Sequence, residues 1–300
     1  MPHVRPAGRA VAAPSLRQRM FVSTGPGRFS PTERAVAYVL LIAVALILIA
    51  PFYFVIVTSL KESKALFEYP PKWIPTPVYF GNYERLLFDT AFPRWMLNTL
   101  FVATTVAAIK VFIDSLAGYA FAKMNFRGRN GMFLLMIAML MVPFGAILIP
   151  LYAVANAIGI TNTYLALILP PLANPLGMFL MRQFIVGLPK DLENAARLDG
   201  VSEFGIYWRI ILPLVKPGLV VLAVIVFTDM YMSFLWPLVS VSDADLTVMT
   251  VGVGLLRTFG ATNFGLSSAA AVMALVPIAL LFFPLQKAFL SRSIAGALKQ

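Results

Sequence analysis

The stretch of residues 130–181 contains no Asp, Glu, Lys or Arg, and this feature constrains the fold more than any other. A helix of roughly 20 apolar residues crosses the hydrocarbon core of a bilayer, so the stretch is long enough for two spans. Asn156, Gly159 and Asn162 interrupt its apolar pattern near the middle and predict the turn between those spans. We therefore interpret the chain as an all-α membrane protein.

The composition supports this interpretation. Of the 300 residues, 60% are hydrophobic and only 12% are charged, whereas a soluble domain carries about 25% charged residues. Further apolar runs complete a prediction of six spans within one transmembrane domain, residues 35–290. The predicted spans are residues 35–60, 95–122, 131–153, 163–181, 210–239 and 266–286.

The distribution of basic residues predicts the orientation of the chain. Six spans place both termini on one side, and Lys and Arg favour the cytoplasm. Most Lys and Arg residues fall on the side of the termini, so we predict that the N- and C-termini are cytoplasmic. Residues 1–34 then form a disordered basic tail and residues 291–300 a short C-terminal tail. The net charge of +11 is explained by this topology, and no nucleic-acid partner is needed.

The sequence gives little support to an enzyme. The chain has no Cys and one His, His3, which lies in the N-terminal tail. We therefore expect no metal site, no thiol nucleophile and no cofactor bound by this chain. The tail lacks the apolar segment of a cleaved secretion signal near Met1. An Arg-rich transit peptide is an alternative interpretation of it.

A polar segment, Glu193-Asn194-Ala195-Ala196-Arg197-Leu198-Asp199-Gly200, separates two long apolar runs. Pro189 can open a helix there, and Gly200 can adopt the left-handed conformation that ends one. Ser202 can cap a second short helix. Residues 187–209 are thus predicted to form a helix–Gly–helix elbow whose small alanines allow close approach of another protein. An ordinary solvated loop helix is the alternative.

This segment and the following Ile210-Ile211-Leu212-Pro213-Leu214-Val215-Lys216-Pro217 resemble the EAA loop of ABC importer permeases. The resemblance is to the carbohydrate-uptake branch, typified by the smaller maltose permease subunit, and it extends from Thr32 to the C-terminus. Further landmarks occur in the same order: Gly81-Asn82-Tyr83, Gly118-Tyr119-Ala120-Phe121-Ala122, Met141-Val142-Pro143 and Phe234-Leu235-Trp236-Pro237-Leu238.

The resemblance implies a type I permease fold in the plasma membrane of a prokaryote, with a coupling helix that docks on a cytoplasmic ATPase dimer. It also implies a second, homologous permease subunit, an extracytoplasmic solute-binding protein and a sugar-type solute. The chain has no Gly-Lys dipeptide and hence no P-loop, so ATP and Mg belong to the partner ATPase. The implied coupling residues are Leu192, Glu193, Asn194, Ala195, Ala196, Asp199 and Gly200.

One position departs from the family pattern. Asn194 stands immediately before Ala-Ala, where relatives usually have Glu, and the acid Glu193 lies one position earlier. The contact with the ATPase would then come from a hydrogen bond of Asn194, or from Glu193 reaching out of the neighbouring position.

Four charged residues lie within predicted spans, where burial of a charge is costly and marks a pathway or a contact inside the bundle. Lys216 lies near the cytoplasmic end of its span, where its long side chain can reach the membrane surface. Lys110 and Asp114 are four residues apart and are predicted to form an ion pair, with a role toward substrate as the alternative. An ion-coupled secondary transporter that uses Lys110, Asp114 and Asp229 is the second hypothesis for the function.

Asp229 has aromatic and polar neighbours on the fifth predicted span. Tyr231, Ser233 and Trp236 follow it, and a carboxylate beside aromatic rings suits the hydroxyl and C–H groups of a sugar. These four residues are predicted to line the translocation pathway. The first hypothesis is accordingly a non-catalytic permease subunit of an ATP-driven importer, for a solute that the sequence does not specify beyond a carbohydrate or related compound.

Overall fold

The computed structural model describes residues 31–62, 66, 69, 72–256 and 263–297, with the backbone alone for 284–297. The described part of the chain is helical and contains no strand, which confirms the all-α prediction. Most of the predicted N-terminal tail, residues 1–30, lies outside the described residues. The chain divides into two units, Met1–Tyr53 and Phe54–Gln300.

Helix α2 (Pro31–Ser59) accounts for the described part of the first unit and continues into the second. Pro31 and Glu33 lie in its first turn, where a missing N–H and a negative charge are both favourable. The helix is long and apolar enough to cross a membrane. It matches the predicted span 35–60.

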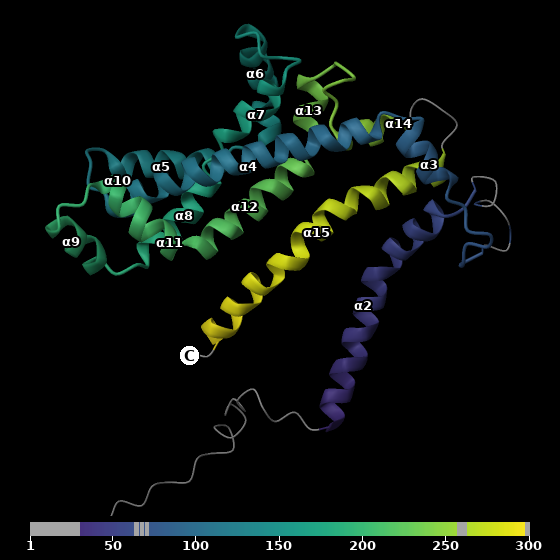
Figure 1. Cartoon of the computed structure of the whole chain (residues 1–300), viewed down its shortest axis with the longest axis horizontal. Coiled ribbons are helices and arrows are strands. Elements are labelled where there is room, and N and C mark those ends of the chain that lie inside the picture. The colour runs from purple at the N-terminus through teal and green to yellow at the C-terminus, as the bar shows by residue number, and fades with distance from the viewer. Residues whose placement is uncertain (1–30, 63–65, 67–68, 70–71, 257–262, 298–300) are drawn as a thin grey trace, which may run out of the picture. The chain divides into compact units, whose positions relative to one another are not determined.

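The second unit is organised around the long helix α4 (Phe92–Lys123), which packs along α8 (Leu176–Val186) and α12 (Lys216–Tyr231) (Figure 1). Gly118 lies on α4 so close to α8 that a Cβ atom there would be 2.7 Å from the Cβ of Met181. This close packing puts the C-terminal part of α4 in direct contact with the chain that leads into the polar segment.

Three of the predicted spans are broken helices. Helices α5 (Arg129–Leu140) and α6 (Phe144–Ala157) meet at 103°, and α7 (Tyr164–Leu172) and α8 meet at 41°. A proline lies directly before the second helix of each pair, Pro143 before α6 and Pro175 before α8. Proline removes a helical hydrogen bond and restricts the backbone conformation of the residue that precedes it. Each of the predicted spans 131–153 and 163–181 therefore corresponds to a bent pair of helices.

The predicted span 210–239 is also divided. The π-helical turn η2 (Tyr207–Ile211) and α11 (Leu212–Leu214) precede α12, with an 80° bend at the junction, and α13 (Leu235–Ser240) is a separate short helix. Three single helices are long and apolar enough to span a membrane, and up to six spans result if each bent pair counts as one, within the residues described.

Helix α15 (Phe264–Ala297) closes the chain and packs against α3 (Gly81–Phe88), α12 and α14 (Met249–Leu256). It contains the predicted span 266–286 but continues to Ala297, so much of the predicted tail 291–300 is helical. Helices α3 and α14 were not predicted. They are short, and their apolar residues contribute to a core cluster that includes Leu86 and Met249.

Candidate functional site

The polar segment forms the elbow that was predicted for residues 187–209. In the structure it continues to the end of η2 (Tyr207–Ile211), and we define the elbow as residues 187–211. Helix α9 (Asp191–Leu198) ends before Gly200, whose φ of +76° is the left-handed conformation that favours glycine. The Ser202 hydroxyl then caps α10 (Glu203–Ile206) by accepting a hydrogen bond of 3.3 Å from the Gly205 N–H. The helix–Gly–helix shape predicted from the sequence is therefore present.

The two faces of α9 have different surroundings. Glu193 and Ala196 are buried, and Ala196 belongs to the main hydrophobic core. The opposite face is exposed, and its predicted coupling residues are Leu192, Asn194, Ala195, Asp199 and Gly200. Leu198, which was not predicted, is also 90% exposed. The expectation that both alanines offer a smooth surface to a partner is wrong, because only Ala195 remains accessible.

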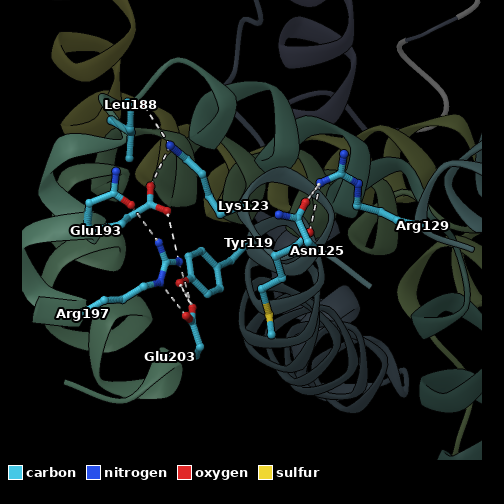
Figure 2. A network of polar contacts seen from close by, with 10 residues as sticks. Tyr119, Lys123, Asn125, Arg129, Leu188, Glu193, Arg197 and Glu203 are labelled. Atoms are coloured by element: carbon cyan, nitrogen blue, oxygen red, sulfur yellow. Dashed lines mark hydrogen bonds and ion pairs between the residues drawn. The ribbon is translucent and has the colours of Figure 1, made fainter. Parts of the chain in front are cut away.

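Glu193 is held inside the chain rather than presented to a partner. Its carboxylate lies 2.7 Å from the Nζ atom of Lys123, the last residue of α4, and both side chains are 2% exposed. Lys123 also donates a hydrogen bond of 2.8 Å to the Leu188 carbonyl (Figure 2). The alternative in which Glu193 reaches out to an ATPase is therefore wrong, because its charge is already paired with Lys123.

A second contact joins the elbow to the same end of α4. Arg197 Nε donates to Glu203 Oε1 at 2.7 Å, and the Tyr119 hydroxyl donates to Glu203 Oε2 at 2.7 Å (Figure 2). These hydrogen bonds from Arg197 and Tyr119 hold the pKa of Glu203, in the elbow, below its usual value. Arg197 also donates to the Asn194 side-chain carbonyl at 3.3 Å, so this exposed amide is oriented by its own helix.

A third contact lies deeper along α4, where the hydroxyls of Ser115 and Tyr207 are 2.7 Å apart and buried. Ser115, Tyr119 and Lys123 are spaced four residues apart and so lie on one face of α4. We call these three residues, with their partners Tyr207, Glu203 and Glu193, the polar ladder. The sequence analysis missed it, although the regular spacing of three polar residues within an apolar helix was a visible signal.

The predicted ion pair between Lys110 and Asp114 is confirmed. Its atoms are 2.9 Å apart and both side chains are nearly buried. Lys110 also donates a hydrogen bond of 2.7 Å to the Asn174 carbonyl, at the break between α7 and α8. Both charges are thus engaged within the chain.

Two of the four predicted pathway residues are enclosed by the chain's own helices. The Tyr231 ring is buried, stacks on Phe227 and donates a hydrogen bond of 2.8 Å to the Ala274 carbonyl. Trp236 is buried too, and its Nε1 atom donates to the Ala166 carbonyl at 2.7 Å. Both side chains therefore pack within this chain instead of lying on an open face of it.

The other two predicted pathway residues differ from these. Asp229 is exposed on α12, and Ser233 is half-buried and accepts a hydrogen bond from the Thr250 hydroxyl through its carbonyl. The sequence grouped the four residues by proximity along the chain, but a helix turns neighbouring side chains to different faces.

Comparison with known proteins identifies the family. Residues 114–294 match the family described as the inner membrane component of binding-protein-dependent transport systems. The chain is 32% identical to an arabinooligosaccharides transport system permease protein of Halalkalibacterium halodurans, over 85% of this chain and 93% of the relative. It is also 32% identical to a sulfoquinovosyl glycerol transport system permease protein of Agrobacterium fabrum, over 83% of this chain and 88% of the relative.

The fold resembles that of a chain in the crystal structure of a bacterial ABC transporter involved in the import of the acidic polysaccharide alginate. The TM-score is 0.73 at 21% identity, over 87% of this chain and 98% of that chain.

Fold and site together define a helical membrane subunit with an elbow fastened to its central helix. The chain belongs to the family of inner membrane components of binding-protein-dependent transport systems, the permease subunits of ABC importers. Such permeases are not catalytic, since ATP is hydrolysed on a separate subunit. The family-level prediction is confirmed, and it is this family assignment that favours the importer permease over the secondary transporter.

Proposed function

We propose that this chain is the permease subunit of an ATP-driven importer for a carbohydrate or related solute, in the plasma membrane of a prokaryote. It has six spans and cytoplasmic termini, in accord with the distribution of Lys and Arg. A second homologous permease forms the other half of the pathway. A cytoplasmic ATPase dimer, which binds ATP and Mg, and an extracytoplasmic binding protein complete the transporter. The carbohydrate class follows the names of the relatives, which transport arabinooligosaccharides and sulfoquinovosyl glycerol.

The observation that carries this proposal is the exposed face of α9 on a firmly attached elbow. Leu192, Ala195 and Leu198 leave apolar surface uncovered, while the opposite face is fixed to α4 through Glu193. A partner that binds this face therefore acts on an element that is attached to the spans. Asn194 faces outward with them and offers the ATPase an amide in place of the usual carboxylate.

Asp229 is the residue that we assign to the pathway. Asp229 lies near the C-terminal end of the apolar helix α12, and an exposed carboxylate there is costly in hydrocarbon, so this face of α12 is covered by water or by another polar surface. We infer that Asp229 faces the aqueous pathway and accepts hydrogen bonds from solute hydroxyls. Asp229→Asn should raise the solute concentration needed for half-maximal uptake without changing how much ATPase co-purifies.

The function is tested with the whole transporter in lipid vesicles. The chain, its partner permease, the ATPase and the binding protein are co-reconstituted, and uptake of a panel of radiolabelled oligosaccharides is measured. We expect uptake that requires ATP and the binding protein and that survives ionophores. Uptake by this chain alone that ionophores abolish would instead establish a secondary transporter.

Coupling through α9 is tested with a pair of glycine variants. Gly200 and Gly128 both have a positive φ, +76° and +81°, and neither has a neighbour within 4 Å of an added Cβ atom. Both Gly200→Phe and Gly128→Phe therefore strain the backbone alike, by about 1–3 kcal/mol. Only Gly200→Phe should lower uptake per ATP hydrolysed, as should the charge reversal Asp199→Arg. Equal uptake per ATP in Gly200→Phe and Gly128→Phe would contradict the assignment.

A further inference from the structure

The elbow follows α8 directly at Gly187, and two further routes lead from it to the other membrane-spanning helices, one to α12 and one to α4. The covalent route runs through η2 and α11 into α12, and it passes a π-helical turn and an 80° bend between Leu214 and Lys216. Pro213 and Pro217 flank that bend, and each lacks an N–H that could stiffen it. The elbow and α12 are therefore joined by a bent junction and not by a continuous straight helix.

The second route is the polar ladder to α4, of which Figure 2 shows the contacts made by Tyr119 and Lys123. Its three α4 residues bond to residues from three different elements, α9, α10 and η2, each over 2.7 Å. These elements lie on both sides of Gly200, so the ladder holds both arms of the elbow against one helix face. The end contacts, Lys123–Glu193 and Ser115–Tyr207, are buried.

Burial makes these contacts hard to separate. A buried polar group that loses its partner is left without solvent to replace it, and a buried charge even more so. A force applied to α9 would therefore displace α4 before it parted Glu193 from Lys123. Helix α4 in turn packs along α8 and α12.

We propose that the polar ladder positions the elbow on α4 and delivers the elbow's movement to that helix, with Lys123 and Glu193 as its principal positioning residues. This inference rests on the proposed function, in which an ATPase moves the elbow. The elbow and α4 move as one body during the transport cycle, and the bent covalent junction to α12 is not sufficient for coupling.

The first test measures whether the elbow and α4 stay together. The chain contains no cysteine, so Phe204→Cys on α10 and Phe112→Cys on α4 give two exposed spin-label sites without removal of native thiols. In the reconstituted transporter, the distance between labels should be the same without nucleotide and with ATP trapped, and uptake is measured on the same labelled protein. A distance that changes with ATP in the otherwise unaltered chain overturns the proposal.

The second test removes the charges without leaving one unpaired. Lys123→Met with Glu193→Gln keeps the size of both side chains and avoids a lone buried charge. We expect the ATPase to co-purify and to hydrolyse ATP, while solute imported per ATP falls about tenfold, within the usual range of coupling between sites. The label distance should now change with ATP. The charge-exchanged pair, Lys123→Glu with Glu193→Lys, should recover most of the lost uptake per ATP.

The matched control makes the same change at the other ion pair of α4. Lys110→Met with Asp114→Asn removes a buried pair that lies within one helix, so uptake per ATP should change by less than about twofold. Unchanged uptake per ATP in the Lys123–Glu193 variant overturns the inference and leaves the proposed function intact. Failure of the ATPase to co-purify with this variant has the same two consequences. An unaltered transporter without ATP-dependent uptake overturns the proposed function, and the inference with it.

Discussion

Helix α4 contributes a lysine to each of two buried ion pairs, and the pairs differ in where the acid comes from. Lys110 and Asp114 lie 2.9 Å apart and belong to the same helix. Lys123 and Glu193 lie 2.7 Å apart and join α4 to α9. The first pair can form whenever α4 is helical, whereas the second forms only when the elbow is seated on α4. The same chemistry therefore neutralises charge in one place and fixes tertiary structure in the other.

The secondary contacts of the two lysines sharpen this difference. Each ammonium group also donates to a backbone carbonyl, Lys110 to Asn174 and Lys123 to Leu188. Leu188 and Glu193 both belong to the elbow, so both contacts of the Lys123 ammonium group attach the elbow to α4. The contacts of Lys110 are divided between its own helix and the α7–α8 break, and its loss would leave the elbow in place.

The largest effect is expected when one partner of a buried pair is removed. Lys123→Met leaves the Glu193 carboxylate buried, with Arg197 at 3.7 Å as its remaining charged neighbour. Loss of one partner of a buried pair costs about 3–5 kcal/mol of stability, and Lys110→Met should cost a similar amount because Asp114 is equally buried. The midpoint of thermal unfolding in detergent measures both.

The comparison predicts that these two variants separate in a second measurement. Protease cleavage within the elbow should become faster in Lys123→Met and stay unchanged in Lys110→Met, because only the first change frees α9. If the protease cleaves the elbow equally fast in the two variants, the Lys123–Glu193 pair stabilises the chain globally, as Lys110–Asp114 does, and does not specifically hold the elbow on α4.

A smaller effect should follow from crowding the local pair without removing a charge. A Cβ atom at Gly177 on α8 would overlap the Asp114 carboxylate and lie 2.8 Å from Leu222 Cδ1, so we expect Gly177→Ala to push Asp114 away from Lys110. Overpacking of this kind costs about 1–3 kcal/mol. Gly145→Ala is the matched control, since it lies on α6 and a Cβ atom there has no neighbour within 4 Å. Equal unfolding midpoints for the two variants would mean that α8 moves to accommodate the methyl group.

The two ion pairs also show what the sequence could predict. The spacing of Lys110 and Asp114 corresponds to one helical turn, so their contact follows from helix geometry alone. Glu193 was assigned to an outside partner because nothing in the local pattern names Lys123, which is distant in the sequence. Because Glu193 is buried, it binds within the chain instead of binding a partner. Burial depends on tertiary packing, which the local sequence pattern does not specify.

The same contrast between local pattern and tertiary packing applies to the spans and to the predicted pathway residues. Runs of apolar residues located α2, α4 and α15 well, because length and hydropathy are local properties. The bends at Pro143 and Pro175 and the separation of α12 from α13 depend on how neighbouring helices accommodate a break. Tyr231 was expected to face a pathway from its place beside Asp229, but the two residues lie on different faces of the helix end.

The smallest effect is expected at a third ion pair, which lies at the opposite end of α4. Arg94 and Asp245 are 2.6 Å apart, but their side chains are 55% and 63% exposed. Exposed pairs contribute about 0–1 kcal/mol, so Asp245→Ala should scarcely change the unfolding midpoint. The Asp245 main-chain carbonyl, which accepts hydrogen bonds from Arg94 and Asn98, remains in the variant. If Asp245→Ala lowers the unfolding midpoint as much as Lys123→Met does, the exposure of an ion pair does not determine its contribution to stability. A negligible drop would confirm that the Lys123–Glu193 contact stabilises the elbow because it is buried, and not merely because the two charges are opposite.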